Sequence, residues 1–230
     1  MKRVECPSPN QDERGSASVD MLVLHYTGMT SGAAALARLC DPAARVSAHY
    51  TIDEDGTVYA MVPETRRAWH AGLSYWAGAR DINARSIGIE LVNPGHEFGY
   101  RAFGEAQMAA LIALCLGLLE RHAIVSWRVL GHSDIAPARK DDPGELFPWQ
   151  RLADAGIGLW PKRGEDPGAA AVSGLLTQYG YDPEAPPEKL VTAFQRHFRP
   201  SCVDGMADAE TRAMLSGLIA LYDAKKGARA

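Results

Sequence analysis

Three side chains that suit a metal ion stand beside short apolar segments of this 230-residue sequence. His25 ends the apolar run 20–24, His132 follows the run 127–130, and Asp142 lies in a loop rich in proline and glycine. Two imidazoles and one carboxylate are a common shell for a catalytic zinc ion, with the fourth position left for water. Zinc lowers the pKa of that water to around 7 and gives a nucleophile at neutral pH. These residue types therefore indicate metal-assisted hydrolysis, although histidine and aspartate sets at such long spacing also arise by chance.

Two further charged residues could take part in catalysis. Glu90 lies within the apolar run SIGIELV, where a buried carboxylate is costly unless it has a partner. It is either an outward-facing residue of an alternating strand or a general base that moves a proton. Lys140, two residues before Asp142, is either a solvated surface charge or a fixed cation that stabilises an oxyanion. The residues alone leave both alternatives open.

Strands and helices that must position these residues alternate along the chain. Short β-prone runs and Ala/Leu-rich periodic runs follow one another, and an acidic turn with a glycine marks a hairpin. This order predicts an α/β fold with a mixed central sheet flanked by helices. A proline- and glycine-rich break then precedes three helical segments. We expect a catalytic domain over 1–160, a linker over 161–168 and a small three-helix domain over 169–230. The expected elements are strands 20–24, 86–92 and 127–130, a hairpin within 47–62, and helices 32–40, 105–122 and 150–157.

Composition excludes several classes of protein. The formal net charge is -4 and the pI is near 6.0, so no basic face for nucleic acid is expected. No apolar stretch approaches the roughly 18 residues of a transmembrane helix. The polar start MKRVECPSPNQDER lacks the apolar core of a secretory signal, which predicts a cytosolic protein. A chain whose leader had been removed would look the same and would be periplasmic.

Six ordered segments resemble one enzyme family over about residues 8–160. They are SPNQDER, VLHYTG, SAHYTIDEDGTVY, RAWHAG, SIGIELVN and GHSDIAPARKDDPG. Together they are similar to the zinc N-acetylmuramoyl-L-alanine amidases, which are related to peptidoglycan recognition proteins and to a bacteriophage lysozyme. The resemblance implies one zinc ion per chain, a catalytic base and a cation at the reacting carbonyl. It assigns His25, His132 and Asp142 to the metal, Glu90 to the base and Lys140 to the cation.

The same resemblance bears on other positions. His70, in RAWHAG, either packs beside its neighbouring tryptophan or lines the substrate cleft, and the resemblance favours the cleft. His49 suits a structural role as readily as substrate contact, and Asn93 is a further candidate for substrate binding. Ala138 stands where relatives usually have glycine, a small change that leaves the metal ligands in place. The C-terminal segments LTQYGYDP, VTAFQRHFRP and DGMADAETRAML resemble a helical peptidoglycan-binding module, which implies possible glycan binding.

The resemblance implies hydrolysis of the amide between N-acetylmuramic acid and L-alanine. The substrate would be peptidoglycan fragments, including 1,6-anhydro-muropeptides, or polymeric peptidoglycan. The missing signal favours recycling of soluble fragments, whereas the C-terminal module favours polymer, and we expect recycling. A non-catalytic wall-binding protein on the same fold is an alternative, but all three ligands and Glu90 are present. A zinc peptidase is disfavoured because the chain has no H-E-x-x-H motif.

Overall fold

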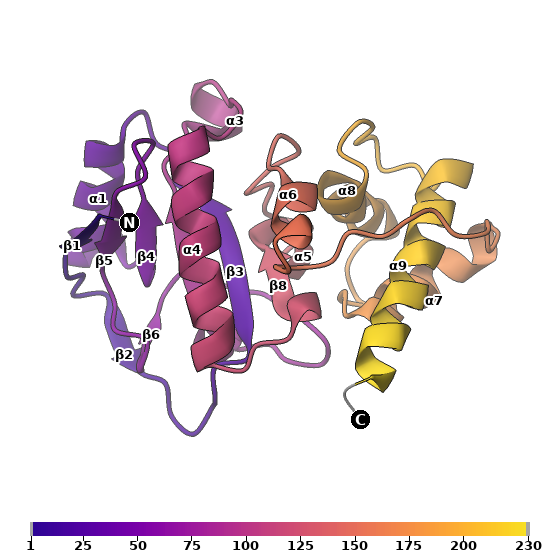
Figure 1. The fold of residues 1–230 in the computed structure, drawn as a ribbon, viewed down its shortest axis with the longest axis horizontal. Coiled ribbons are helices and arrows are strands. Elements are labelled where there is room, and N and C mark those ends of the chain that lie inside the picture. The colour runs from indigo at the N-terminus through magenta and orange to yellow at the C-terminus, as the bar shows by residue number, and fades with distance from the viewer. Residues whose placement is uncertain (1, 229–230) are drawn as a thin grey trace.

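The computed structural model describes residues 2–228 and is built around one six-stranded mixed sheet (Figure 1). The strand order is β1-β5-β4-β7-β3-β8, and β2 and β6 form a separate antiparallel pair. β3 lies between β7 and β8 and is parallel to both, whereas β4 and β5 form the expected antiparallel hairpin. The strands are β1 (Arg3–Glu5), β2 (Gln11–Glu13), β3 (Met21–Tyr26), β4 (Tyr50–Ile52), β5 (Val58–Ala60), β6 (Arg66–Ala68), β7 (Ser86–Leu91) and β8 (Val129–Gly131).

Helices cover the sheet and form the C-terminal region, so the expected fold class is confirmed. The long helix α4 lies across one face of the sheet, in front of β3 and β4 in Figure 1. α7, α8 and α9 lie together beyond the edge strand β8. The helices are α1 (Gly32–Cys40), α2 (Ile82–Arg85), α3 (Gly95–Phe98), α4 (Glu105–Arg121), α5 (His132–Ile135), α6 (Trp149–Asp154), α7 (Val172–Tyr179), α8 (Pro187–Phe198) and α9 (Ala209–Gly227), with 3-10 turns at Pro42–Ala44, Ser126–Arg128 and Ala169–Ala171.

The central strand β3 serves two cores. Leu22 and Leu24 pack in the core that contains α4, whereas Met21 and Val23 pack in a second core with the C-terminal helices. Side chains alternate between the faces of a strand, so His25 points to the same face as Met21 and Val23. The first of the expected metal ligands therefore lies on the face opposite α4.

β7 repeats this alternation next to β3. Its isoleucines belong to the core that contains α4, which leaves Ser86, Gly88 and Glu90 on the opposite face. His25 and Glu90 are partners in the parallel register of the two strands. The expected ligand and the expected base therefore meet at the same edge and on the same face of the sheet.

The C-terminal helices pack directly against the rest of the chain. Residues 161–168 contain no helix or strand, yet Trp76 makes edge contacts with Tyr179 and Tyr181 at ring-centroid distances of 5.4 and 5.0 Å. A Cβ at Gly180 would lie 2.7 Å from the indole of Trp76, so this close approach requires glycine. The two regions thus share a buried apolar interface.

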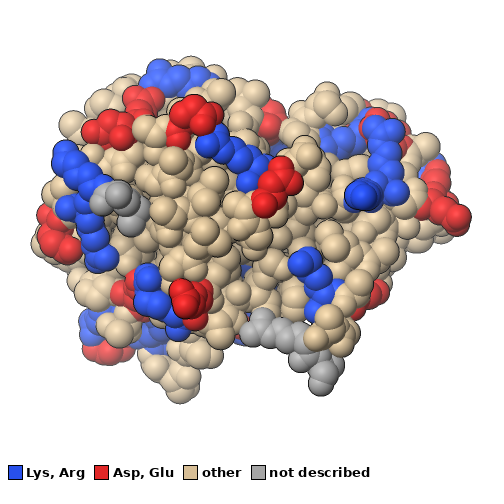
Figure 2. Space-filling view, viewed as in Figure 1, with Lys and Arg blue, Asp and Glu red and all other residues tan. Residues whose placement is uncertain are grey.

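Figure 2 shows acidic and basic side chains interspersed on the face that carries α4, without a large area of one sign. Within residues 2–228, no helix has the length and apolar character needed to cross a membrane.

The buried guanidinium of Arg14 connects the N-terminal segment to β7. Arg14 is 7% exposed and donates to backbone carbonyls of two separate segments of the chain. Buried carbonyls need hydrogen-bond donors, and a guanidinium supplies several from one side chain. Arg14 therefore fixes the start of the strand that carries Glu90. The accepting carbonyls belong to Asn83, Ala84 and Ser86 on one side and to Glu64 and Arg66 on the other.

We expect Arg14→Leu to lower the free energy of unfolding by about 3 kcal/mol, because several buried carbonyls lose their donor. Urea denaturation followed by circular dichroism measures the change. Arg3→Leu is the matched control, since Arg3 is an exposed residue whose ion pair with Glu5 lies on the surface, and it should change stability by less than about 0.5 kcal/mol. Equal losses in the two variants would contradict the role given to Arg14.

Candidate metal centre and catalytic cleft

The three expected ligands come together in a buried cluster. His25 lies near the carboxyl end of β3, His132 begins α5 directly after β8, and Asp142 lies in the loop that follows. Asp142 Oδ2 is 2.9 Å from His25 Nδ1 and 3.0 Å from His132 Nδ1, and the two Nδ1 atoms are 3.0 Å apart. All three residues are at least nine-tenths buried. The sequence therefore identified residues that the fold brings together as a possible metal site.

The hydrogen bond at the outer nitrogen of His132 fixes its tautomer. Nε2 of His132 is 3.1 Å from the carbonyl oxygen of Ala71. A carbonyl only accepts, so Nε2 carries the proton and donates it. In the neutral ring Nδ1 then has a free lone pair, and this atom faces Asp142. Such outer hydrogen bonds orient metal-binding imidazoles in many proteins.

A longer chain of hydrogen bonds fixes the tautomer of His25. Ser86 Oγ donates to the Ile82 carbonyl at 2.6 Å, so its proton is already committed. Ser86 Oγ must therefore accept from His70 Nε2, which is 3.1 Å away. His70 Nδ1 is left as an acceptor for His25 Nε2 at 3.1 Å. Nδ1 of His25 is thus the nitrogen with the free lone pair, as in His132.

Gly88 provides the space that this chain needs. A Cβ at position 88 would lie 2.4 Å from Cγ of His70, closer than any side chain tolerates. The His70 ring therefore lies against the backbone of β7, next to Ser86. A glycine inside a strand commonly marks such a close approach. The Gly in SIGIE is the local sequence signal for this packing.

The donor set fits a zinc ion. Two imidazole lone pairs and one carboxylate oxygen converge at a buried point, which is the shell that zinc prefers when a fourth position stays open. Burial chiefly lowers the pKa of His25, to about 4, so the ring is neutral at pH 7. Burial alone would raise the pKa of Asp142, but the neighbouring His132 and His25 hold it well below its ordinary value. A negative carboxylate beside two imidazole nitrogens makes a site for a cation.

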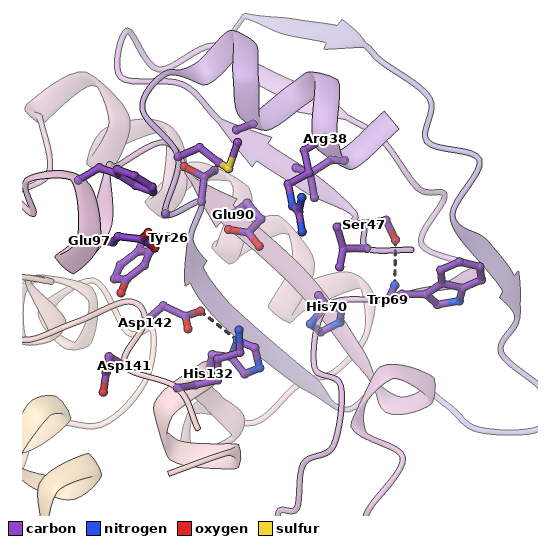
Figure 3. Close-up of a pocket in the computed structure, with 18 of the residues that line it drawn as sticks. Tyr26, Arg38, Ser47, Trp69, His70, Glu90, Glu97, His132, Asp141 and Asp142 are labelled. Atoms are coloured by element: carbon purple, nitrogen blue, oxygen red, sulfur yellow. Dashed lines mark hydrogen bonds and ion pairs between the residues drawn. The ribbon is translucent and has the colours of Figure 1, made fainter. Parts of the chain in front are cut away.

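The cluster opens into a cleft of about 610 Å³. Figure 3 shows Glu90 pointing into this cleft. Asp142 and His132 lie below it in this view, Arg38 lies above it and His70 lies to its lower right. Lys140 also lines the cleft. Its ammonium has no hydrogen bond or ion pair with the part of the chain that the structure describes. A cation and a carboxylate therefore face the cavity next to the ligand cluster.

Glu90 is a carboxyl group whose pKa is strongly shifted. Its Oε2 is buried and has no hydrogen-bond partner among residues 2–228. Burial raises the pKa of Glu90 well above its ordinary value, the charge of Asp142 adds to the rise, and Lys140 opposes it. A carboxyl group with a raised pKa near a cleft is typical of residues that transfer protons.

Two residues expected as substrate contacts lie away from the cleft surface. His49 is fully buried, and its Nδ1 accepts from the Gly88 N–H at 3.0 Å. Its Nε2 is 3.1 Å from the carbonyl of Arg66. Asn93 is also buried, and its amide group donates to the Arg101 carbonyl. Both side chains use their polar atoms within the protein, whereas His70 lies at the cleft as expected.

Two residues of the site were not expected from the sequence. Ser86 belongs to the hydrogen-bond chain that runs from His25 to the Ile82 carbonyl, and the spacing 86, 88, 90 could have placed it on the same face as Glu90. Arg38 of α1 lines the cleft, where Figure 3 shows its guanidinium directed towards the cavity. Nothing in the helical run 32–40 distinguishes this arginine from a surface residue.

The chemistry that such a site can perform is limited. Water attack on an acyl group needs a proton acceptor beside the nucleophile and a positive charge for the oxygen that becomes negative. A partly buried carboxyl group and an unpaired ammonium in one cleft, next to candidate ligands for a Lewis acid, meet both needs. Fold and site together define the class: a hydrolase with a candidate metal centre.

Comparison with known proteins identifies the family. Residues 15–145 match the family described as N-acetylmuramoyl-L-alanine amidase. The chain is 40% identical to N-acetylmuramoyl-L-alanine amidase AmiD of Escherichia coli K12, over 89% of this chain and 83% of that protein. It is 36% identical to 1,6-anhydro-N-acetylmuramyl-L-alanine amidase AmpD of the same organism, over 64% of this chain and 87% of that protein. The chain therefore belongs to the N-acetylmuramoyl-L-alanine amidase family, as the sequence segments predicted.

Solved structures agree with this assignment over almost the whole chain. AmpDh3 from Pseudomonas aeruginosa superposes with a TM-score of 0.83 at 35% identity, covering 92% of this chain and 94% of that one. The Escherichia coli AmiD complex gives a TM-score of 0.80 at 39% identity, covering 90% and 92%. The mixed sheet and the C-terminal helices therefore belong to an architecture that these amidases share.

We expect Ser86→Ala to weaken zinc binding by about tenfold, because the proton on His25 Nε2 loses its fixed acceptor chain. Competition with a chromogenic chelator measures the zinc dissociation constant. Thr51→Val is the matched control, since it removes another buried hydroxyl from the neighbouring strand β4, where Oγ1 has its one hydrogen bond among the described residues with the sulfur of Met61. If both variants bind zinc like the wild type, Ser86 does not set the tautomer of His25.

Proposed function

We propose that this chain uses one zinc ion, held by His25, His132 and Asp142, to hydrolyse the amide between N-acetylmuramic acid and L-alanine. The observation that carries the proposal is the convergence of three ligand atoms at the cleft that also holds Glu90. Membership of the amidase family supports the reaction type. A non-catalytic binding protein would have no need to keep the ligands, Glu90 and Lys140 in one cavity.

Each residue has a distinct part in the proposed reaction. When bound, zinc supplies a Lewis acid that lowers the pKa of water and polarises a carbonyl. The Glu90 carboxylate accepts a proton from the attacking water and returns it to the nitrogen of L-alanine as the amide breaks. Its raised pKa supports this role, because the carboxyl group then holds the proton readily. The products are the lactyl acid of the sugar and a peptide with a free L-alanine amine.

Lys140 would stabilise the charge that develops on the attacked carbonyl oxygen. Its unpaired ammonium at the cleft wall supports this role, since no carboxylate of residues 2–228 forms an ion pair with it. Fixed donors or cations aimed at an oxyanion typically contribute about 3 kcal/mol to the rate. His70 has a positioning role in this proposal, because its Nδ1 fixes the proton of His25. His49 and Asn93 likewise hold backbone around the cleft.

The proposed substrates are peptidoglycan fragments. The AmiD structure was solved with anhydro-N-acetylmuramic acid-L-Ala-D-gamma-Glu-L-Lys, and AmpDh3 with an anhydromuramic pentapeptide. A cleft of about 610 Å³ falls in the size range of sites for such ligands. We therefore propose 1,6-anhydro-muropeptides as substrates and recycling of wall fragments in the cytosol as the role. Fractionation of the native full-length protein tests the location, and an envelope location would favour action on polymeric wall.

The division of the chain belongs to the same proposal. Residues 1–160 would form the catalytic domain, 161–168 the linker and 169–230 the helical domain. The lack of regular structure over 161–168 supports this division. The division does not mean that each part folds by itself, because the two parts share a buried core.

We expect Glu90→Gln to lower kcat by at least about a hundredfold while zinc remains bound, because the proton acceptor is lost and the ligands are intact. Mass spectrometry of the peptide released from a soluble anhydro-muropeptide measures the rate, and a chelator should abolish release by the wild type. Glu97→Gln is the matched control, since Glu97 lines the same cleft and should retain most activity. Near-normal release by the Glu90 variant would overturn the assignment.

A further inference from the structure

Asp134 carries a carboxylate buried beside the metal centre, two residues after His132. Its side chain is 0% exposed and accepts three hydrogen bonds. The Gly131 N–H donates to Oδ2 at 2.7 Å, which closes the turn that leads into α5. The other two donors are the Tyr181 hydroxyl at 2.7 Å and His197 Nδ1 at 2.7 Å. Two of the three donors to this carboxylate therefore come from the C-terminal region.

Both C-terminal donors are held rigidly. His197 is 2% exposed, and its ring stacks on Trp149 at a centroid distance of 3.7 Å. Tyr181 is fully buried and packs edge-on against Trp76. A buried ring with few free rotamers directs its polar atom to one place. These side chains can therefore act as fixed supports for Asp134.

Arg196, the residue before His197, contacts the far end of the segment that joins His132 to Asp142. The Arg196 guanidinium is 3.0 Å from Asp141 Oδ1 and 3.6 Å from Glu145 Oε2. Asp141 precedes the ligand Asp142. α8 also lies against α5, the helix that His132 begins. Two adjacent residues of α8 thus contact both ends of the loop that joins the second and third metal ligands.

We propose that the C-terminal helical region is a structural part of the metal centre, in which Tyr181 and His197 position His132 through Asp134. Neither residue touches the ligands, so both are positioning residues. A buried carboxylate that loses a donor must find another or move, and movement of Asp134 shifts the turn that carries His132. This goes beyond the glycan binding expected of the region. It rests on the proposed metal site, but zinc affinity tests it independently of amidase activity.

Tyr181→Phe in the full-length chain is the first test, because it removes one hydroxyl and keeps the ring. We expect zinc affinity, measured by chelator competition, to fall at least tenfold while circular dichroism stays that of the wild type. Tyr179→Phe is the matched control. Tyr179 is buried in the same core and contacts the same Trp76, but its hydroxyl has no hydrogen bond among the described residues. Its zinc affinity should stay within twofold of the wild type.

A pair of His197 variants separates hydrogen bonding from packing. His197→Leu removes the donor to Asp134, whereas His197→Asn keeps an N–H near the position of Nδ1. We expect the leucine variant to lose at least tenfold in zinc affinity and the asparagine variant to recover most of it. Equal zinc affinities for the two tyrosine variants, with the wild-type fold in both, would overturn the proposal. If His197→Leu fails to fold, the tyrosine pair still decides.

Discussion

The parallel, in-register pairing of β3 with β7 and β8 is the constraint on which the site depends. It sets His25 beside Glu90, and it pairs Leu24 with Gly131 so that His132 follows at the same edge. A shift of one residue in either pairing would turn a functional side chain to the opposite face of the sheet. The apolar residues between them prevent such a shift, because Leu22 and Leu24 must stay in the core beneath α4.

The second requirement is electrostatic. Three ionisable ligands are removed from water, and the protein compensates with hydrogen bonds that leave one lone pair of each imidazole free. The chain from the Ile82 carbonyl through Ser86 and His70 to His25 does this across β7, and the Ala71 carbonyl does it for His132. Because each donor and acceptor is committed, the ligand geometry exists before any cation binds.

The sequence predicted those parts of the molecule that local patterns encode. Apolar runs and their periodicity located β3, β7, the hairpin and α4, and the glutamate inside SIGIELV marked a candidate functional position. The short edge strands β1, β2 and β6 were missed because RVE, QDE and RRA are polar and carry no periodic signal. The expected strand over 127–130 begins later, at Val129, because a 3-10 turn occupies Ser126–Arg128.

Contacts between distant segments could not be predicted in the same way. His197 and Asp134 are 63 residues apart, and the sequence around His197 suggests only an amphipathic helix. The proposed ligands, base and cation were chosen because their short motifs resemble a family, which is information about related chains. Ser86 and Arg38 lie outside the chemistry of those motifs, and only the folded arrangement gives them a place in the site.

The separation of the ligands along the chain has a consequence for how the protein matures. His25 is 107 residues from His132 and 117 from Asp142, so no short segment of the chain contains His25 together with either of the other two residues. Small zinc modules, whose ligands are close in sequence, fold around the ion. Here the sheet pairs strands that are far apart in the sequence, and such long-range pairing makes its assembly slow. We therefore expect the ion to enter a finished fold, so that metal scarcity during synthesis would leave a folded chain that can be activated later.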